Sequence, residues 1–98
     1  MDRIALVTGS GSGIGRAVAV ALSRAGHNIV LTGRRVAPLE ETAALCVCEV
    51  LIHAADVSNP GEVHGLFTAI QQRFGRLDLL FNNAGVFTAG LPIDAKAG

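Results

Sequence analysis

Residues 8–15 read Thr8-Gly9-Ser10-Gly11-Ser12-Gly13-Ile14-Gly15, and no other part of this 98-residue chain says as much about its architecture. The stretch follows an apolar run at 4–7, which predicts a buried strand, and precedes apolar residues at helical spacing. Glycines at such a junction let an anion approach the backbone, and the N-terminus of the helix faces the negative charge. A tight turn that binds nothing is the alternative interpretation of the same glycines.

The spacing of these glycines separates three kinds of phosphate-binding loop. A P-loop requires Lys followed by Ser or Thr after its last glycine, but Arg16 and Ala17 follow Gly15. The sequence therefore does not support ATP or GTP hydrolysis. The common Gly-x-Gly-x-x-Gly fingerprint also fails, because glycines at 9 and 11 would require a third at position 14, which is Ile14. The spacing that fits is Gly9, Gly13 and Gly15.

Strands and helices alternate along the rest of the chain. The helix that ends before Gly75 has Ser58 or Asn59 as its cap, followed by Pro60 and the capping-box acid Glu62. The order βαβαβαβ predicts an α/β fold with a parallel sheet and right-handed crossovers, and its ligand is expected beyond the carboxyl ends of the strands. Strands are predicted at 4–7, 29–31, 50–54 and 77–81, helices at 14–22, 39–45 (entered near Pro38) and 63–74, and the ligand-facing pieces at 8–15, 33–34, 56–57 and 82–85.

Length and composition limit what the chain can be. We expect one domain over residues 1–88 and an irregular tail at 89–98. Half of the residues are apolar and 16% are charged, as expected for strands that are covered on both faces. Eight basic residues offset eight acidic ones, so nucleic acid and anionic membranes are not expected partners. The N-terminal apolar run is too short for a signal peptide or a membrane span, which favours a cytoplasmic protein.

The two cysteines give no sign of a metal centre or of a disulfide framework. Cys46 and Cys48 lie two residues apart, and the chain holds no second cysteine pair. We interpret them as small, partly buried apolar residues, and we assign no metal ligand.

Three motifs in order resemble the short-chain dehydrogenase/reductase family. The pattern Thr-Gly-x-x-x-Gly-Ile-Gly follows the first strand, Asp56-Val57 follows the third, and Asn82-Asn83-Ala84-Gly85 follows the fourth. The resemblance extends over residues 3–87. It implies the N-terminal, NAD(P)-binding part of a Rossmann-like fold with strand order 3-2-1-4. It also implies an oxidoreductase that transfers hydride between a nicotinamide cofactor and an alcohol or carbonyl substrate.

The resemblance also implies roles for particular residues. The hydroxyls of Ser10 and Ser12 would face the adenosine ribose and the phosphates, and Thr8 would tie the glycine loop to the backbone of Ala84. Asp56 would accept a hydrogen bond from the adenine amino group, although a helix-capping acid is the alternative for this residue. The cofactor-binding set is Gly9, Ser10, Ser12, Gly13, Ile14, Gly15, Arg34, Asp56, Val57, Asn83, Ala84 and Gly85.

The end of the second strand bears on the choice of cofactor. Family members that prefer NAD carry an acid there for the ribose 2′-hydroxyl, but this chain has Gly33. Arg34 and Arg35 follow, and a guanidinium suits a 2′-phosphate. We therefore expect NADP, with NAD as the alternative and solvated surface charge as the non-functional interpretation of the arginines. The opposing signal is Ser12, where NADP-binding members carry a basic residue.

No catalytic residue can be assigned. The family uses a Tyr-x-x-x-Lys pair, whereas this chain contains no tyrosine and its only lysine is Lys96. His27, His53 and His64 fall on separate elements and do not suggest a replacement. We therefore expect a dehydrogenase truncated before its catalytic residues, and the alternative is a non-catalytic dinucleotide-binding protein. The fourth strand would be left as a sheet edge, which favours a homo-oligomer that pairs there.

Overall fold

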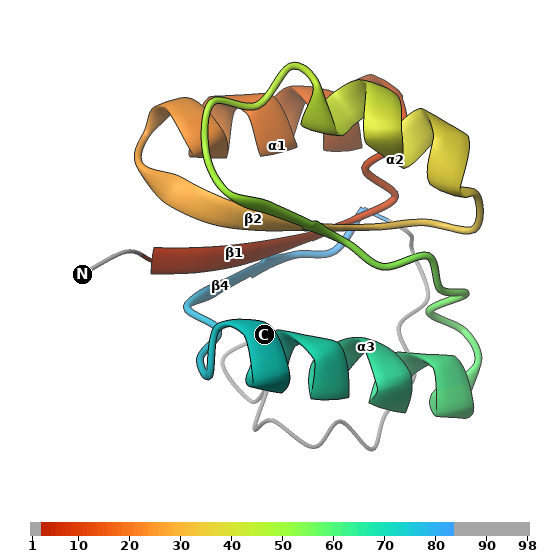
Figure 1. Cartoon of the computed structure of the whole chain (residues 1–98). Helices are drawn as coiled ribbons and strands as arrows, with labels where there is room; N and C mark the ends of the chain where they lie inside the picture. Colours follow the sequence, from red (N-terminus) through yellow and green to blue (C-terminus); the bar gives the residue numbers. More distant parts are fainter. Residues whose placement is uncertain (1–2, 84–98) are drawn as a thin grey trace.

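The computed structural model describes residues 3–83, which alternate strictly between strand and helix (Figure 1). The predicted order βαβαβαβ is thereby confirmed. The expected domain boundary at residue 88 and the tail at 89–98 lie outside the described residues. The elements are β1 (Arg3–Thr8), α1 (Gly13–Arg24), β2 (His27–Thr32), α2 (Val36–Ala43), β3 (Val50–Ile52), α3 (Pro60–Arg73) and β4 (Leu79–Phe81).

The strands form a parallel sheet in the order β3-β2-β1-β4, as the family resemblance implied. Thr8 at the end of β1 pairs with Thr32 at the end of β2, and Phe81 at the end of β4 pairs with Val7. The carboxyl ends of the strands therefore lie along one edge of the sheet. β2 and then β3 extend the sheet on one side of β1, and β4 pairs with the other side of β1. The topological switch point therefore lies between β1 and β4.

The sheet has a buried apolar layer on each face. α1 and α2 cover one face and α3 covers the other (Figure 1). Alternate residues of β1 serve the two layers, because successive side chains of a strand point to opposite faces. Ile4 and Leu6 pack with the α3 residue Phe67, whereas Ala5 packs with the α2 residue Leu39. The burial of β1 on both faces explains its unbroken apolar sequence.

Several element boundaries differ from the sequence prediction, and the third strand, predicted at 50–54, ends at Ile52. α2 begins at Val36, two residues before Pro38, and ends at Ala43. Proline is compatible with this early position because the N–H groups of the first turn have no partner within the helix. β4 begins at Leu79, two residues later than predicted.

The cap of α3 is Asn59. Its side-chain oxygen accepts from the backbone N–H of Glu62 at 3.1 Å. The Glu62 carboxylate does not complete the expected capping box with Asn59, and instead accepts from the backbone N–H of Asp56 at 2.8 Å. The acid thus fixes the loop that leads from β3 into α3.

Gly15 allows the first turn of α1 to lie against the end of β1. A Cβ atom at this position would overlap the carbonyl oxygen of Gly9 and would lie 3.1 Å from the side-chain nitrogen of Asn83. Real Cβ atoms do not approach backbone so closely, so glycine is required by space at this buried position. The contact fixes where the glycine loop sits between strand and helix.

Asp78 anchors the entrance of β4 to the start of β1. One carboxylate oxygen accepts from the backbone N–H of Ile4 at 2.8 Å, and the other accepts from Arg76 at 2.6 Å. The Arg76 hydrogen bonds, and after them the Ile4 amide, hold the pKa of Asp78 below its usual value. The carboxylate therefore stabilises the fold only while it is ionised.

Substitution of Gly15 tests the close contact between α1 and β1. We expect Gly15→Ala to lower the free energy of unfolding by about 2 kcal/mol or more, because backbone must move to admit the methyl group. Gly65→Ala is the matched control, since the nearest atom to its Cβ would lie 3.9 Å away in an interior turn of α3. This change should stabilise the protein by up to about 1 kcal/mol. Urea unfolding of both variants measures the difference, and equal effects would contradict the steric argument.

The Asp78 anchor predicts a pH dependence of stability. Because the pKa of Asp78 is lowered in the folded state, its contribution is present above the unfolded pKa and is lost as pH falls through the folded pKa. The stability difference between the wild type and Asp78→Asn should be constant above about pH 5 and should shrink below about pH 4. Thermal unfolding of both proteins across this range provides the measurement. A difference that persists to about pH 2 would show that ionisation of Asp78 contributes nothing.

Candidate functional site

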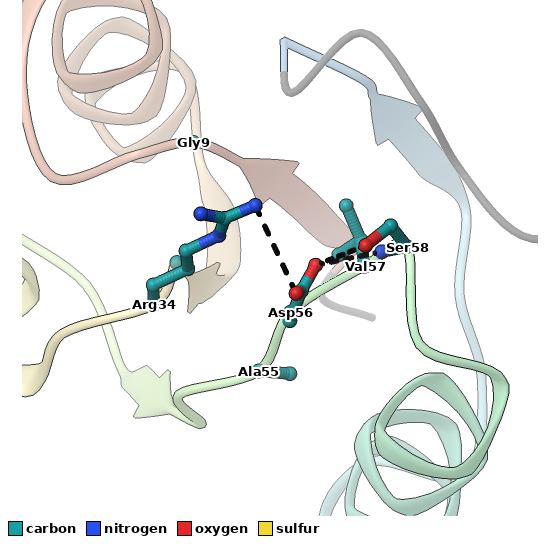
Figure 2. A pocket seen from close by; sticks show the side chains of 7 residues that line it. Gly9, Arg34, Ala55, Asp56, Val57 and Ser58 are labelled. Carbon is teal, nitrogen blue, oxygen red and sulfur yellow. Dashed lines mark hydrogen bonds and ion pairs between the residues drawn. The ribbon is translucent and has the colours of Figure 1, made fainter.

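A cleft of about 390 Å³ opens at the carboxyl edge of the sheet (Figure 2). It draws residues from three loops, those that follow β1, β2 and β3. The pairing of β2 with β3 continues past the strand ends, since the N–H of Ala55 donates to the Gly33 carbonyl at 2.8 Å. The loops after β2 and β3 are thereby held side by side. The lining residues are Gly9, Gly33, Arg34, Ala55, Asp56, Val57 and Ser58.

The glycine loop beside this cleft presents backbone donors. Within the described part of the chain, no acceptor bonds to the N–H groups of residues 11–14, which lead into α1. Ser12 is the cap residue, and its exposed side chain makes no capping hydrogen bond. Gly13 adopts φ +57°, a conformation that other residues rarely adopt. Such a group of free N–H donors at the positive end of a helix is suited to a phosphate or diphosphate.

Ser10 faces the opposite way from the sequence expectation. It is fully buried, and its hydroxyl and its backbone N–H both lie 3.3 Å from the carbonyl oxygen of Thr32. The side chain therefore joins the loop to the end of β2 and does not face the open side of the loop. The expected contact of Ser10 with a ligand remains a prediction, and Ser12 is the loop serine whose side chain is exposed.

Ile14 is the most exposed hydrophobic residue of the loop, with 67% of its surface accessible. Removing a large aliphatic side chain from water is favourable, so a contact that covers Ile14 would be stabilising. In this position it offers an apolar contact beside the backbone donors. Val57 has the opposite environment, because it also lines the cleft but is buried in the layer beneath α3.

Thr8 connects the glycine loop to the segment after β4. Its hydroxyl donates to the Asn82 side-chain oxygen at 2.9 Å and accepts from the backbone N–H of Asn83 at 2.8 Å. The side chain of Asn83 donates in turn to the Gly9 carbonyl at 3.4 Å. The structure thus places Asn83 against the glycine loop. The implied partner of Thr8, Ala84, lies outside the described residues, as does Gly85.

Arg34 and Asp56 meet across the cleft (Figure 2). The guanidinium nitrogen lies 3.8 Å from a carboxylate oxygen of Asp56, and 79% of the Arg34 side chain is exposed. The other Asp56 oxygen accepts from the hydroxyl of Ser58 at 2.6 Å and from its backbone N–H at 3.0 Å. The Ser58 hydroxyl, its amide and then the charge of Arg34 lower the pKa of Asp56. Asp56 is therefore a stable carboxylate at neutral pH.

This geometry limits the alternative role for Asp56. Its carboxylate caps the local turn at Ser58, while Asn59 caps α3 itself. The pair with Arg34 is long and exposed, and pairs of this kind contribute about 0–1 kcal/mol. Arg34 can therefore leave Asp56 for a stronger anionic partner at little cost.

Arg16 and Thr42 bond to backbone carbonyls of the glycine loop, and the sequence alone does not indicate this role for either residue. Arg16 bonds to the Gly11 carbonyl, and Thr42 bonds to the Ser10 carbonyl. No local pattern reveals these contacts, because Thr42 lies 26 residues from Arg16 and belongs to a different helix. The only sign of this role is that Thr42 is a buried polar residue, and its burial is known only once the fold is known.

Other candidate groups of the chain do not converge. Among residues 3–83, no three His, Cys, Asp or Glu side chains are grouped closely enough to hold a metal ion. His27, His53 and His64 do not line the cleft. A search of the same residues finds no helix with the length and apolar character that crossing a bilayer requires.

Comparisons with known proteins agree with the geometry. The sequence model of the short chain dehydrogenase family matches residues 3–96. D-beta-hydroxybutyrate dehydrogenase of Rhizobium meliloti (strain 1021) is 44% identical over 93 residues, which cover 88% of this chain and 35% of that protein. Levodione reductase of Leifsonia aquatica is 43% identical over 90 residues, covering 87% and 34%. The chain thus spans about a third of the length of these relatives.

A solved structure shows the same arrangement of strands and helices. L-sorbose reductase from Gluconobacter frateurii, complexed with NADPH and L-sorbose, superposes with a TM-score of 0.81 and 38% identity. The match covers 87% of this chain and 34% of that one. The family match, the sheet order and the glycine loop lead to one conclusion: the chain belongs to the short chain dehydrogenase family.

Proposed function

We propose that this chain binds NADP(H) along the carboxyl edge of its sheet. In this proposal it forms the dinucleotide-binding part of an oxidoreductase that transfers hydride between the nicotinamide and an alcohol or carbonyl. The observation that carries the proposal is the placement of Arg34, an exposed guanidinium at the end of β2 that shares a cleft with Gly9 of the glycine loop. A cation and a set of free N–H donors at one edge match a ligand with two separate phosphate groups.

The diphosphate would lie at the N-terminus of α1. Free N–H groups at 11–14 would donate to its oxygens. Gly13 leaves the approach unobstructed, because a side chain there would project into open space, whereas Gly15 holds α1 against the end of β1. Ser12 would add a hydroxyl, and Ile14 would cover the ligand with its exposed aliphatic group. The donors are charge-complementary to phosphate and need no bound metal to act.

The adenosine would occupy the cleft between the loops after β2 and β3. The carboxylate oxygen of Asp56 that faces Arg34 would accept from the adenine amino group, while the Val57 backbone would contact the ring. Asn83, Ala84 and Gly85 would lie along the adenosine ribose, and the contact of Asn83 with Gly9 supports this assignment for the first of them.

The preference for NADP over NAD rests on charge at the end of β2. Gly33 provides no carboxylate for a ribose 2′-hydroxyl, whereas Arg34 can form two charge-assisted hydrogen bonds with a 2′-phosphate. These bonds are shorter and stronger than the 3.8 Å contact with Asp56, so exchange of partner is favourable. The NADPH complex of the related L-sorbose reductase supports the same choice.

The nicotinamide supplies the hydride in such a reaction, and the proton requires a separate acid/base. The cleft residues hold and orient the cofactor, but none of them is placed as a proton donor for a substrate. The whole protein's substrate is not specified by this part of the chain. A non-catalytic dinucleotide-binding protein is the second candidate. NADPH oxidation assayed with a panel of carbonyl compounds distinguishes the two functions.

Charge reversal at Arg34 tests the cofactor choice. We expect Arg34→Glu to weaken NADPH binding about tenfold or more, because the new carboxylate would face the 2′-phosphate. NADH binding should change by less than about threefold. Arg24→Glu makes the same change of charge at the far end of α1 and serves as the control. Fluorescence titration of both cofactors provides the dissociation constants, and equal losses for NADPH and NADH would remove Arg34 from the 2′-phosphate site.

The exposed side of β4 supports a homo-oligomer as a further part of the proposal. Within residues 3–83, β4 pairs only with β1, so its other side carries backbone groups available to another strand. Leu79 in this strand is 40% exposed. Unpaired strand edges with apolar side chains favour pairing with a second copy.

A lysine at the β4 edge should oppose this association. In dilute solution we expect a dimer or larger species that shifts toward monomer with Leu79→Lys, because an edge charge disfavours strand pairing. Val47→Lys is the matched control, since Val47 is 71% exposed in the loop after α2. Analytical ultracentrifugation with hydrogen exchange at residues 77–82 provides the readout. A monomeric wild type whose β4 amides exchange freely would contradict the proposal.

A further inference from the structure

Two side chains hold the carbonyl groups of the glycine loop. A terminal guanidinium nitrogen of Arg16 in α1 donates to the Gly11 carbonyl at 2.5 Å. The Arg16 Nε donates to the hydroxyl of Thr42 in α2 at 2.9 Å, and that hydroxyl donates to the Ser10 carbonyl at 2.7 Å. Successive carbonyls of the loop are therefore fixed by side chains from two different helices.

Thr42 has little freedom to do anything else. It is fully buried, and a hydroxyl has one hydrogen to donate. The nearer acceptor is the Ser10 carbonyl at 2.7 Å, compared with 3.2 Å to the Pro38 carbonyl. Arg16 also reaches the Pro38 carbonyl, at 3.3 Å, so this oxygen keeps a partner. Burial makes the bond from Thr42 to Ser10 costly to lose, because water does not replace it.

These carbonyl contacts determine where the loop N–H groups point. A trans peptide unit is planar, and its N–H is directed opposite to its C=O. The unit whose oxygen bonds to Thr42 carries the N–H of Gly11, and the unit whose oxygen bonds to Arg16 carries the N–H of Ser12. The N–H of Gly11 is therefore turned away from Thr42, and the N–H of Ser12 is turned away from the Arg16 guanidinium. Neither has an acceptor among the residues that the structure describes.

We propose that Arg16 and Thr42 are positioning residues for the dinucleotide, which they do not touch. They hold the peptide units of the glycine loop so that the N–H groups of Gly11 and Ser12 are oriented to donate hydrogen bonds to ribose and phosphate oxygens. Preorganised donors bind an anion without the cost of ordering the loop. The inference rests on the proposed dinucleotide binding and adds two residues to it.

The arrangement also separates this role from a merely structural one. A simple tie between α1 and α2 would affect stability alone. Loss of a positioning bond would weaken every ligand that uses the loop, with or without a 2′-phosphate. Glu41, the fourth partner of Arg16, is 3.2 Å away with 70% of its side chain exposed, and such a pair contributes little. It provides a matched control on the same guanidinium.

The binding experiment compares NADPH, NADH and ADP on one set of variants. Thr42→Val keeps the shape of the side chain but removes its hydroxyl. We expect this change to weaken the binding of all three ligands equally, by about tenfold, which is the value of one hydrogen bond from a loop N–H to a charged phosphate. Arg16→Met should act in the same way. Thr42→Ser and Glu41→Gln should bind like the wild type. Wild-type affinity for all three ligands in Thr42→Val would overturn the inference, as would a loss confined to NADPH.

A second measurement requires no ligand. Residual dipolar couplings of the backbone amides report the direction of each N–H bond. We expect the Gly11 coupling to change in Thr42→Val and the Ser12 coupling to change in Arg16→Met, with both unchanged in Thr42→Ser and Glu41→Gln. Unchanged couplings in the first two variants would overturn the inference. A wild type that binds none of the ligands would instead contradict the proposed function, while the couplings would still decide the role of these residues.

Discussion

The contact of Gly15 with the carbonyl of Gly9 sets the position of everything at the carboxyl edge of the sheet. It brings the first turn of α1 against the end of β1 at a distance that no other residue would permit. The chain between the two must then turn sharply, and its N–H groups are left without helical partners. Asn83 packs on the same two glycines, so the segment after β4 depends on the same contact.

The two halves of the cleft are held with different strength. Buried hydrogen bonds and short backbone approaches fix the glycine loop on one side. On the other side, Arg34 makes a long ion pair in solvent and keeps its freedom to move. A rigid donor set beside an adjustable cation suits a ligand whose diphosphate is constant and whose 2′ substituent decides the affinity. The pKa of Asp56 is lowered first by the Ser58 hydroxyl and amide, so its carboxylate is charged at neutral pH without depending on Arg34 alone.

Much of the fold could be predicted from local pattern. The order of strands and helices along the chain and the placement of the glycine loop follow from short apolar runs and helical periodicity, whereas the strand order in the sheet is what the family resemblance implied. The orientation of the Ser10 side chain could not be predicted, because it depends on a contact with Thr32 at the end of β2, 22 residues away. The same reason hides Arg16 and Thr42, whose partners are distant in sequence. Local pattern identifies candidates, whereas side-chain direction comes from packing.

The central place of β1 has a consequence for the order in which the chain acquires structure during synthesis. β1 can pair with β2 as soon as the first helix has formed, because these strands are close in sequence. Its other side has to wait for β4, whose anchor residue lies 74 positions away. Until that segment leaves the ribosome, one side of a strand with a fully apolar interior is left without its neighbour. Nascent chains in that interval expose the kind of edge that chaperones recognise and that other nascent chains can pair with.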